Sequence, residues 1–240
     1  MFTTIFTQPI FNLLVFLYDA VPGHSIGIAI IGLTVVVKLV LWPLSMKALR
    51  SQKALTDLQP KVEELKKKYG SNKEEHAKAL MALYSAEKVS PTSSCLPVLV
   101  QLPIFIALYQ ALVQGLKSDG FQMLYPFVAN PGTIDTHFLN LDLAVPNGLL
   151  AVLSGITQYF QAKMMATSRP PRGTPGSADE DTLAVMNKQM LYMMPVMTVF
   201  IGWSLPGGLA LYWLTTNALA VAQQMVFLRN GKIKKAEGGL

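Results

Sequence analysis

Lys38 is the residue of this chain whose type and position point most clearly to chemistry. It lies within the apolar run 25–44, which is long enough to cross a bilayer as a helix. A Lys near a helix centre raises the free energy of insertion by about 2.5 to 3.5 kcal/mol, whereas each Val, Ile or Leu lowers it by roughly 0.3 to 0.6 kcal/mol. Because ionisable side chains inside membranes usually bind ions or polar groups, we expect Lys38 to be functional. The alternative is a side chain that extends to the nearer membrane interface.

Glutamines in other apolar runs are candidates for lining a polar groove or for hydrogen bonds between helices. Gln158 and Gln161 lie three residues apart and so share one face of a helix, where both roles are open. Gln101 and Gln110 lie nine residues apart, which places them on opposite faces of a helix. At most one of these two therefore faces water, and we take Gln101 as the groove candidate.

Residues for acid–base, nucleophilic or metal chemistry are not grouped in this sequence. His24, His76 and His137 fall in three different loops, and the long apolar runs contain no Asp or Glu. The one cysteine, Cys95, excludes an intramolecular disulfide, and no Cys/His spacing fits a metal site. There is also no Walker motif or glycine-rich phosphate loop. We therefore expect neither chemical catalysis nor a cofactor.

The composition is that of a polytopic membrane protein, with 51% hydrophobic and only 14% charged residues. Stretches of roughly 17 to 25 apolar residues predict transmembrane helices. We expect an all-α fold with five spans, at residues 25–44, 95–116, 145–162, 190–205 and 209–228. The fourth span is short and only Pro206-Gly207-Gly208 joins it to the fifth, so a re-entrant hairpin is the alternative for this pair.

Positive charges set the expected orientation, because Lys and Arg are enriched in cytoplasmic loops. Eighteen of the twenty Lys and Arg residues lie in three segments, which are 46–94, 163–188 and the tail 229–240. The predicted outer segments, which include the loop 117–144, hold only Lys117. We therefore expect five spans with the N-terminus outside and the C-terminus in the cytoplasm.

Residues 1–22 predict an amphipathic helix in the outer interface, since a sixth span would place the basic segment 46–94 outside. The polar side chains of this helix fall within an arc of about 80° at helical pitch, and they are Thr4, Gln8, Asn12 and Asp19. Pro9 suits the first turn of its main segment. The first twenty residues contain no Lys or Arg, unlike a signal or transit peptide, so we expect a mature N-terminus.

Segment 46–94 predicts an antiparallel pair of cytoplasmic helices. Apolar residues recur at intervals of three or four up to Tyr69, Gly70 ends the first helix, and a capping box at Asn72 begins a second helix through about Lys88. Ten basic and six acidic residues leave this hairpin at net +4. That charge fits anionic lipid head groups, ribosomal RNA, an acidic client chain or simply a solvated loop. Sequence-specific nucleic-acid recognition is not expected.

Four stretches of the sequence resemble the YidC-type membrane protein insertases. They are Lys38-Leu-Val-Leu-Trp-Pro43-Leu-Ser, Met81-Ala-Leu-Tyr-Ser-Ala-Glu-Lys-Val-Ser-Pro91, Cys95-Leu-Pro-Val-Leu-Val-Gln-Leu-Pro-Ile-Phe-Ile-Ala-Leu-Tyr109 and Leu205-Pro-Gly-Gly-Leu-Ala-Leu-Tyr-Trp213-Leu-Thr-Thr-Asn217. The resemblance covers nearly the whole chain. It implies a protein that inserts and folds membrane proteins, alone or beside the Sec translocon. In that family five helices enclose a water-filled groove, open to the cytoplasm and to lipid, with one cation on the first helix.

The same resemblance implies roles for individual residues. Lys38 occupies the position of the groove cation, where the family more commonly has Arg, and Lys keeps the charge without the forked donor geometry. Tyr212 and Trp213 match aromatic positions of the fifth helix, with Trp213 placed either near the cation or at the membrane interface. Cys95 matches a family cysteine. Methionines of the fourth span are candidates for an adaptable surface along which client helices slide, namely Met190, Met193, Met194 and Met197.

The implied partners are nascent membrane proteins and the lipid bilayer, with a Sec translocon and a ribosome as further candidates. The implied location is a bacterial cytoplasmic membrane, with an organellar origin left open. A small transporter or channel is a rival class, because Lys38 could bind an anion or relay protons, although no internal repeat supports it. An intramembrane enzyme is a second rival class. No Ser/His pair or carboxylate pair can be assembled within the apolar runs of this sequence to support it.

Overall fold

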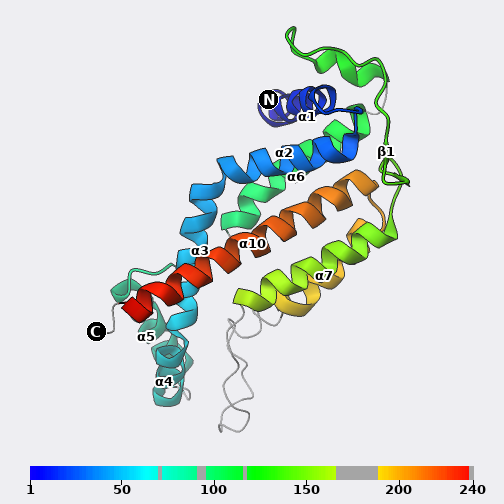
Figure 1. Cartoon of the computed structure of the whole chain (residues 1–240). Helices are drawn as coiled ribbons and strands as arrows, with labels where there is room; N and C mark the ends of the chain where they lie inside the picture. Colours follow the sequence, from blue (N-terminus) through cyan, green and yellow to red (C-terminus); the bar gives the residue numbers. More distant parts are fainter. Residues whose placement is uncertain (70–71, 91–95, 116–117, 166–188, 238–240) are drawn as a thin grey trace.

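The structure, a computed structural model, describes residues 1–69, 72–90, 96–115, 118–165 and 189–237. These ranges form an elongated, mostly helical molecule with a bundle of long helices and a helical pair that extends from one end (Figure 1). The helices are α1 (Gln8–Ala20), α2 (Ile26–Val40), α3 (Trp42–Asp57), α4 (Gln59–Tyr69), α5 (Lys73–Ala86), α6 (Leu96–Gly115), α7 (Gly148–Met165), α9 (Met194–Gly202) and α10 (Gly207–Glu237). Shorter helical turns are η1 (Thr3–Thr7), η3 (Ser118–Met123) and η4 (Gln189–Met193).

The predicted span 25–44 is not one straight helix. α2 ends at Val40, α3 begins at Trp42, and the two axes differ by 65°. Pro43 lies in the first turn of α3, where its ring removes a backbone donor and would clash with the carbonyl of Leu39 in a continuous helix. By length and composition, no single helix in the described ranges is long and apolar enough to cross a membrane, whereas α2 and α3 together could do so as a bent pair.

The other helices differ from the predicted spans mainly at their ends. α6 and α7 begin and end within three residues of the runs 95–116 and 145–162. The regular part of the fourth run is only α9, after the π-helical turn η4. α10 continues to Glu237, so much of the predicted tail 229–240 is helical, in keeping with its three Lys residues, which favour helix. Most of the predicted loop 163–188 lies outside the described residues.

In the structure, α4 and α5 lie within the segment that was predicted to form a helical hairpin. The Asn72 side chain accepts a hydrogen bond from the backbone N–H of Glu75, which is the expected N-cap of α5. The two helices pack through a small apolar cluster that is centred on Leu58, Val62 and Tyr84. Gly70, the predicted helix end, lies outside the described residues.

α10 is held between α7 and α2 by apolar packing and by two buried polar contacts. The Ser154 hydroxyl of α7 donates to the carbonyl of Ala210 at 2.9 Å, and the Asn217 side chain donates to the carbonyl of Ser154 at 3.1 Å. Gly155 of α7 lies so close to α9 that a methyl group in its place would overlap Val199. The two hydrogen bonds of Ser154 fix the rotation of α10, and with it the direction of the side chains in its second half.

The main apolar core lies in the half of the bundle nearest α1. It consists of buried side chains from the first half of α2, the second half of α6, the starts of α7 and α10, α1, and the loop before α7; its members include Tyr18, Ile30, Leu33, Leu108, Leu112, Leu143, Leu150 and Leu209. The backbone N–H groups of Gly207 and Gly208 donate to the carbonyls of Val145 and Leu143. These bonds satisfy free donors at the start of α10 and join it to the start of α7. This end of the bundle is therefore tightly packed.

An antiparallel pair of short strands, β1 (His137–Phe138) and β2 (Leu141–Asp142), covers this packed end. The all-α expectation misses it. Leu139 and Asn140 form its two-residue turn, and both have positive φ, of 48° and 62°. Asn tolerates this conformation but Leu does not favour it, so the turn has no clear sequence signature. The Phe138 ring packs directly against the backbone at Gly27 of α2.

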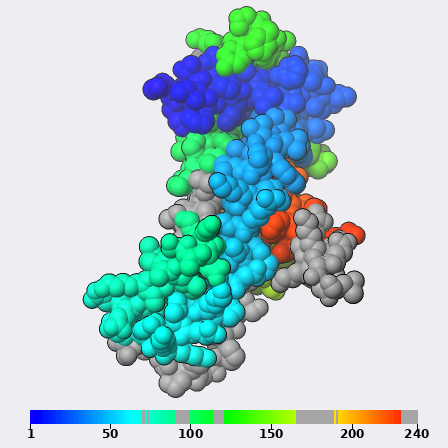
Figure 2. Space-filling model, turned by 90° about the vertical axis from the view of Figure 1, so that its left-hand side faces the viewer, coloured from blue at the N-terminus to red at the C-terminus, as the bar shows by residue number. Residues whose placement is uncertain are grey.

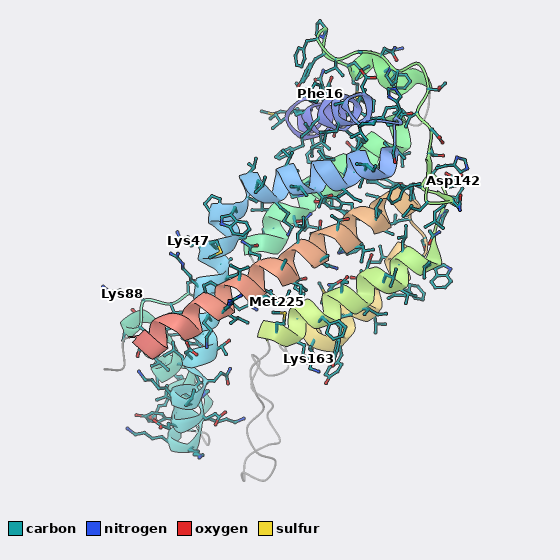
Figure 3. The ribbon with its side chains drawn as sticks, viewed as in Figure 1. Phe16, Lys47, Lys88, Asp142, Lys163 and Met225 are labelled. Atoms are coloured by element: carbon teal, nitrogen blue, oxygen red, sulfur yellow. The ribbon has the colours of Figure 1, made fainter. Side chains whose placement is uncertain are left out.

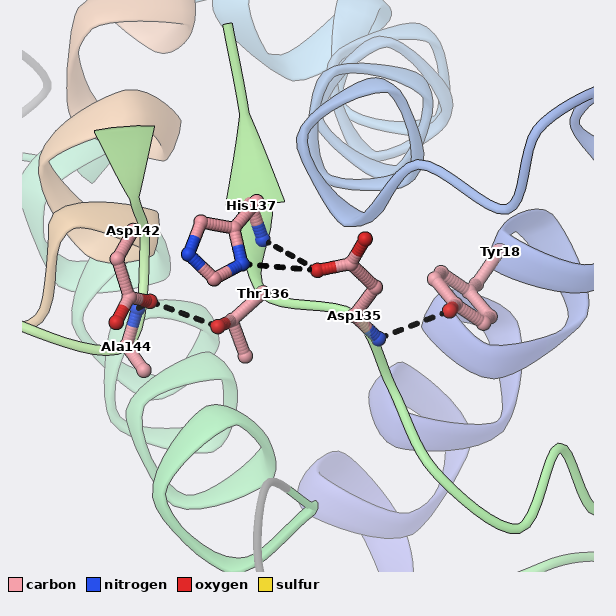
Figure 4. A network of polar contacts seen from close by, with 6 residues as sticks. All are labelled: Tyr18, Asp135, Thr136, His137, Asp142 and Ala144. Carbon is pink, nitrogen blue, oxygen red and sulfur yellow. Dashed lines mark hydrogen bonds and ion pairs between the residues drawn. The ribbon is translucent and has the colours of Figure 1, made fainter. Parts of the chain in front are cut away.

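A polar network fixes this strand pair next to α1 (Figure 4). The Tyr18 hydroxyl accepts a hydrogen bond from the backbone N–H of Asp135 at 2.9 Å. Hydrogen bonds from the backbone and side chain of His137 lower the pKa of Asp135, and those from the Thr136 hydroxyl and the Ala144 backbone lower the pKa of Asp142. Both carboxylates therefore stabilise the folded loop at neutral pH, and this contribution is lost only as the pH falls through the lowered pKa values.

α1 crosses the bundle instead of extending it, since it is seen almost end-on in Figure 1 while α2, α7 and α10 run across the view. Two residues of its predicted polar arc, Gln8 and Asn12, contact the backbone of the loop between α6 and α7, whereas Thr4 and Asp19 are exposed. The Asn12 side chain is buried, donates to the carbonyl of Met123 and accepts from the backbone N–H of Tyr125. Gln8 donates to the same Met123 carbonyl. Pro9 lies in the first turn of α1, as predicted.

Candidate functional site

A cavity of about 120 Å³, lined by both polar and apolar side chains, lies in the half of the bundle away from the apolar core. Its walls come from the junction of α2 and α3, the start of α6, the end of α7 and the second half of α10. Figure 2 shows the α2 and α3 side of this region, as the blue strip between α1 above and the α4–α5 hairpin below. A single water needs roughly 10–15 Å³, so the cavity can hold several.

Lys38 lines this cavity from the last turn of α2, just before the break at Leu41. Its side chain is half-buried. Within the described part of the chain, no Asp or Glu lies within ion-pair distance of Lys38, and none lines the cavity. A cation in such a place attracts anionic groups that enter the cavity.

Gln101 lines the cavity, and Tyr212 binds it from behind the cavity wall. The Gln101 amide of α6 donates to the hydroxyl of Tyr212, which is almost fully buried in α10. Gln110 faces elsewhere, because its side-chain oxygen accepts a hydrogen bond from the Thr7 hydroxyl at 2.7 Å. Only Gln101 of this pair reaches the cavity, as the spacing on the helix predicts.

Gln158 and Gln161 do not share one role. Gln161 lines the cavity, whereas the Gln158 side-chain oxygen accepts a hydrogen bond from the Thr198 hydroxyl of α9. Gln158 therefore joins two helices, which is the alternative that the sequence left open. A three-residue spacing places two side chains about 60° apart, enough for them to face different neighbours.

Trp213 packs against the Phe105 ring of α6, with ring centroids 5.2 Å apart. Neither Trp213 nor Tyr212 lines the cavity, as far as the described residues show its walls. Met193, Met194 and Met197 lie on the exposed side of η4 and α9. The side chain of Met190 and the whole of Cys95 lie outside the described residues.

Several polar residues of the cavity were not singled out from the sequence. Ser45 and Gln52 of α3 lie beyond the predicted span, and the bend after Val40 brings them to the cavity. Gln223 and Gln224 of α10 also line it, and both are buried. Two adjacent glutamines in the apolar run 209–228 are the sequence signal that could have revealed this pair.

Side chains on the outer faces of α7 and α9 are apolar and exposed, among them Ile156, Phe160, Val196 and Phe200. Helices with apolar outer faces that enclose a cavity with polar and charged side chains are characteristic of polytopic membrane proteins. The chain belongs to the 60Kd inner membrane protein family, whose sequence model matches residues 16–235.

Individual relatives agree with this assignment. The membrane protein insertase YidC of Nitratidesulfovibrio vulgaris (strain DSM 19637 / Miyazaki F) is 36% identical over 228 residues, which are 94% of this chain and 38% of that protein. The membrane protein insertase YidC of Fusobacterium nucleatum subsp. nucleatum is 35% identical over 207 residues, which are 86% of this chain and 88% of that protein. The chain thus spans about two fifths of the length of the first curated relatives it matches.

A solved structure of the same kind is also similar. The crystal structure of an active YidC insertase with its first transmembrane domain resolved matches 92% of this chain and 45% of that chain, with a TM-score of 0.60 and 25% identity. The mostly helical fold expected from the sequence is therefore confirmed.

Proposed function

We propose that this protein is a membrane protein insertase and folding chaperone that holds polar client segments in the cavity around Lys38. The observation that carries the proposal is the division of the bundle into a packed apolar half and a half with a cavity that contains Lys38 and several carboxamide side chains. Polar client groups in the hydrocarbon core of a bilayer lack hydrogen-bond partners. A water-filled cavity that reaches partway across the bilayer shortens the distance over which these client groups lack hydrogen-bond partners.

Transfer of the client's own apolar span into lipid supplies the free energy for this process, so no chemical step is required. An acidic client tail is drawn towards Lys38, while the client helix leaves along the apolar outer surface. The exposed methionines Met193, Met194 and Met197 suit this exit path, because flexible thioether side chains adapt to varied client helices. The partners in this proposal are nascent membrane proteins and the lipid bilayer.

We further propose five spans, with the cavity half towards the cytoplasm and the N-terminus outside. In Figure 3, Lys47 and Lys88 lie on the left-hand side of the bundle and Lys163 lies at its lower edge, while Asp142 lies at its right-hand end. This separation of charge fits the preference for positive residues in cytoplasmic loops. A reporter enzyme fused after Leu240 should be located in the cytoplasm, and its activity should be found there and not outside the cell. Activity of that reporter outside the cell would contradict the proposed orientation.

The insertase activity is tested by reconstitution. The full chain in liposomes should insert a single-span client with a short acidic outer tail at least tenfold faster than protein-free liposomes do. Protection of the tail from added protease measures insertion, and an equal amount of an unrelated helical membrane protein is the control for disturbed lipid packing. Insertion no faster than in protein-free liposomes would contradict the proposal.

A further inference from the structure

Two neighbouring side chains of α10 are buried with polar atoms that lack a partner. Gln223 and Gln224 have only 7% and 5% of their surface exposed. Among the described residues, neither the Nε2 atom of Gln223 nor the Oε1 atom of Gln224 has a hydrogen-bond partner. Buried amides are normally paired, because an unpaired donor or acceptor keeps the full cost of losing water. These two polar atoms are therefore free to bind a polar group that enters the cavity.

Both glutamines face the cavity, although adjacent residues of a helix point about 100° apart. Ala220 also lines the cavity, three and four residues before them and so on the same side of α10. Its small side chain leaves space beside the two amides. The contacts of Ser154 with Ala210 and Asn217 fix this rotation of α10, so the pair is held in place by the fold.

The other polar residues that line the cavity indicate which chemical group it would bind. Gln52 and Gln161 add carboxamides from α3 and α7, and Lys38 is the charged residue among the described residues of the wall. Carboxamides offer donors and acceptors without charge, so they do not select for the charge of a side chain. A peptide group offers the complementary pair, with one N–H and one C=O. Every client segment contains this group, whatever its sequence.

We propose that Gln223 and Gln224 bind the main-chain peptide groups of an extended client segment. This inference rests on the proposed insertase function and names the part of the client that this section of the cavity binds. Gln224 accepts from a client N–H and Gln223 donates to a client C=O. The cavity thus combines one charge-dependent contact, at Lys38, with a contact to the backbone that is independent of client sequence.

The experiment compares two synthetic single-span clients with the same neutral outer tail. One tail has ordinary peptide bonds, and the other has ester bonds at alternate positions, which remove N–H donors with little change in shape. Insertion is measured in liposomes with the full-length protein, with the double variant Gln223→Met/Gln224→Met, and without protein. Rates are divided by the protein-free rate for the same client, because loss of N–H groups also eases passive crossing. Gln189→Met, at an exposed residue at the start of η4, is the matched control.

We expect the unmodified protein to insert the ester client about fivefold more slowly than the amide client, the effect of one neutral hydrogen bond. The double variant loses both hydrogen bonds, so it should insert the amide client about 25-fold more slowly and should not distinguish the two clients. Met has a similar shape to Gln and has no polar atoms that need a hydrogen-bond partner. The double variant should therefore keep its thermal midpoint in detergent. Gln189→Met should behave as the unmodified protein.

Equal relative rates for the two clients with the unmodified protein would overturn the inference while leaving the insertase proposal intact. A double variant that still distinguishes the two clients would also overturn the inference. The preference for the amide client would then not depend on Gln223 and Gln224. If the unmodified protein inserts neither client faster than protein-free liposomes, the proposed function itself fails and the inference fails with it.

Discussion

Replacing Lys38 by Leu should slow insertion of a client with an acidic outer tail at least tenfold, whereas Lys38→Arg should retain most of the activity. The charge in the cavity is the reason. Two opposite charges 4 Å apart attract by about 4 kcal/mol at an effective dielectric constant near 20, and a tenfold change corresponds to about 1.4 kcal/mol. Even a partly screened attraction between Lys38 and a client carboxylate is therefore strong enough to account for a tenfold change in rate. The measurement is protease protection of the client tail in liposomes that contain each variant.

A client with a neutral tail of the same length is the control for this result. Lys38→Leu should alter its insertion by less than threefold, because no carboxylate is present to be attracted. Folding should not suffer, since Leu favours the membrane interior where Lys costs about 2.5 to 3.5 kcal/mol. Equal rates for Lys, Arg and Leu at this position with the acidic client would remove Lys38 from the mechanism. A similar loss with both clients would point to a structural role.

Gly27→Ala should destabilise the packed end of the bundle by about 1 to 3 kcal/mol, the usual cost of inserting a methyl group into a packed site. The ring of Phe138 fills the space that the new methyl group would occupy. Accommodating it requires Phe138, and with it the strand pair β1–β2, to move away from α2. The expected result is a lower thermal midpoint in detergent. Protease cleavage in the loop 117–144 should also become faster.

Gly32→Ala is the matched control, because it lies in the same helix and its added methyl group would be 3.5 Å from Leu17, an ordinary contact. This variant should be neutral or slightly stabilised, since Ala favours a helix over Gly by roughly 0.5–1 kcal/mol. The double variant Gly27→Ala/Phe138→Ala should be less destabilised than the sum of its single changes. Additive effects, or equal stability of the Gly27 and Gly32 variants, would contradict close packing of Phe138 on α2.

The features best predicted from the sequence are those that depend on neighbouring residues. The cap at Asn72, the apolar faces of α4 and α5, and the position of Pro9 all follow from local hydrogen bonding or helical periodicity. The break before Pro43 was missed although its cause is local, because an apolar run long enough to span a membrane outweighed the effect of one proline near its end. The strand pair was missed because Leu139 is not a typical residue of its turn.

The cavity was only partly predicted, because its polar residues come from several helices. Spacing separates the two faces of one helix, as it does for Gln101 and Gln110, but it does not say which face meets the cavity. Gln158 pairs with Thr198 while Gln161 lines the cavity, and that difference depends on where α9 packs. Gln223 and Gln224 reach the cavity through the rotation of α10 against α7.

The sequence alone determined the class of protein, the family resemblance, the distribution of charge and the position of the cation Lys38 within an apolar run, because hydrophobicity and charge are properties of each residue and their order. Only the tertiary structure decided which polar groups share the cavity with Lys38 and which pair between helices. That choice follows from the relative rotation and bending of helices. These depend on packing between residues far apart in the chain, such as Ser154 with Ala210 or Gly27 with Phe138.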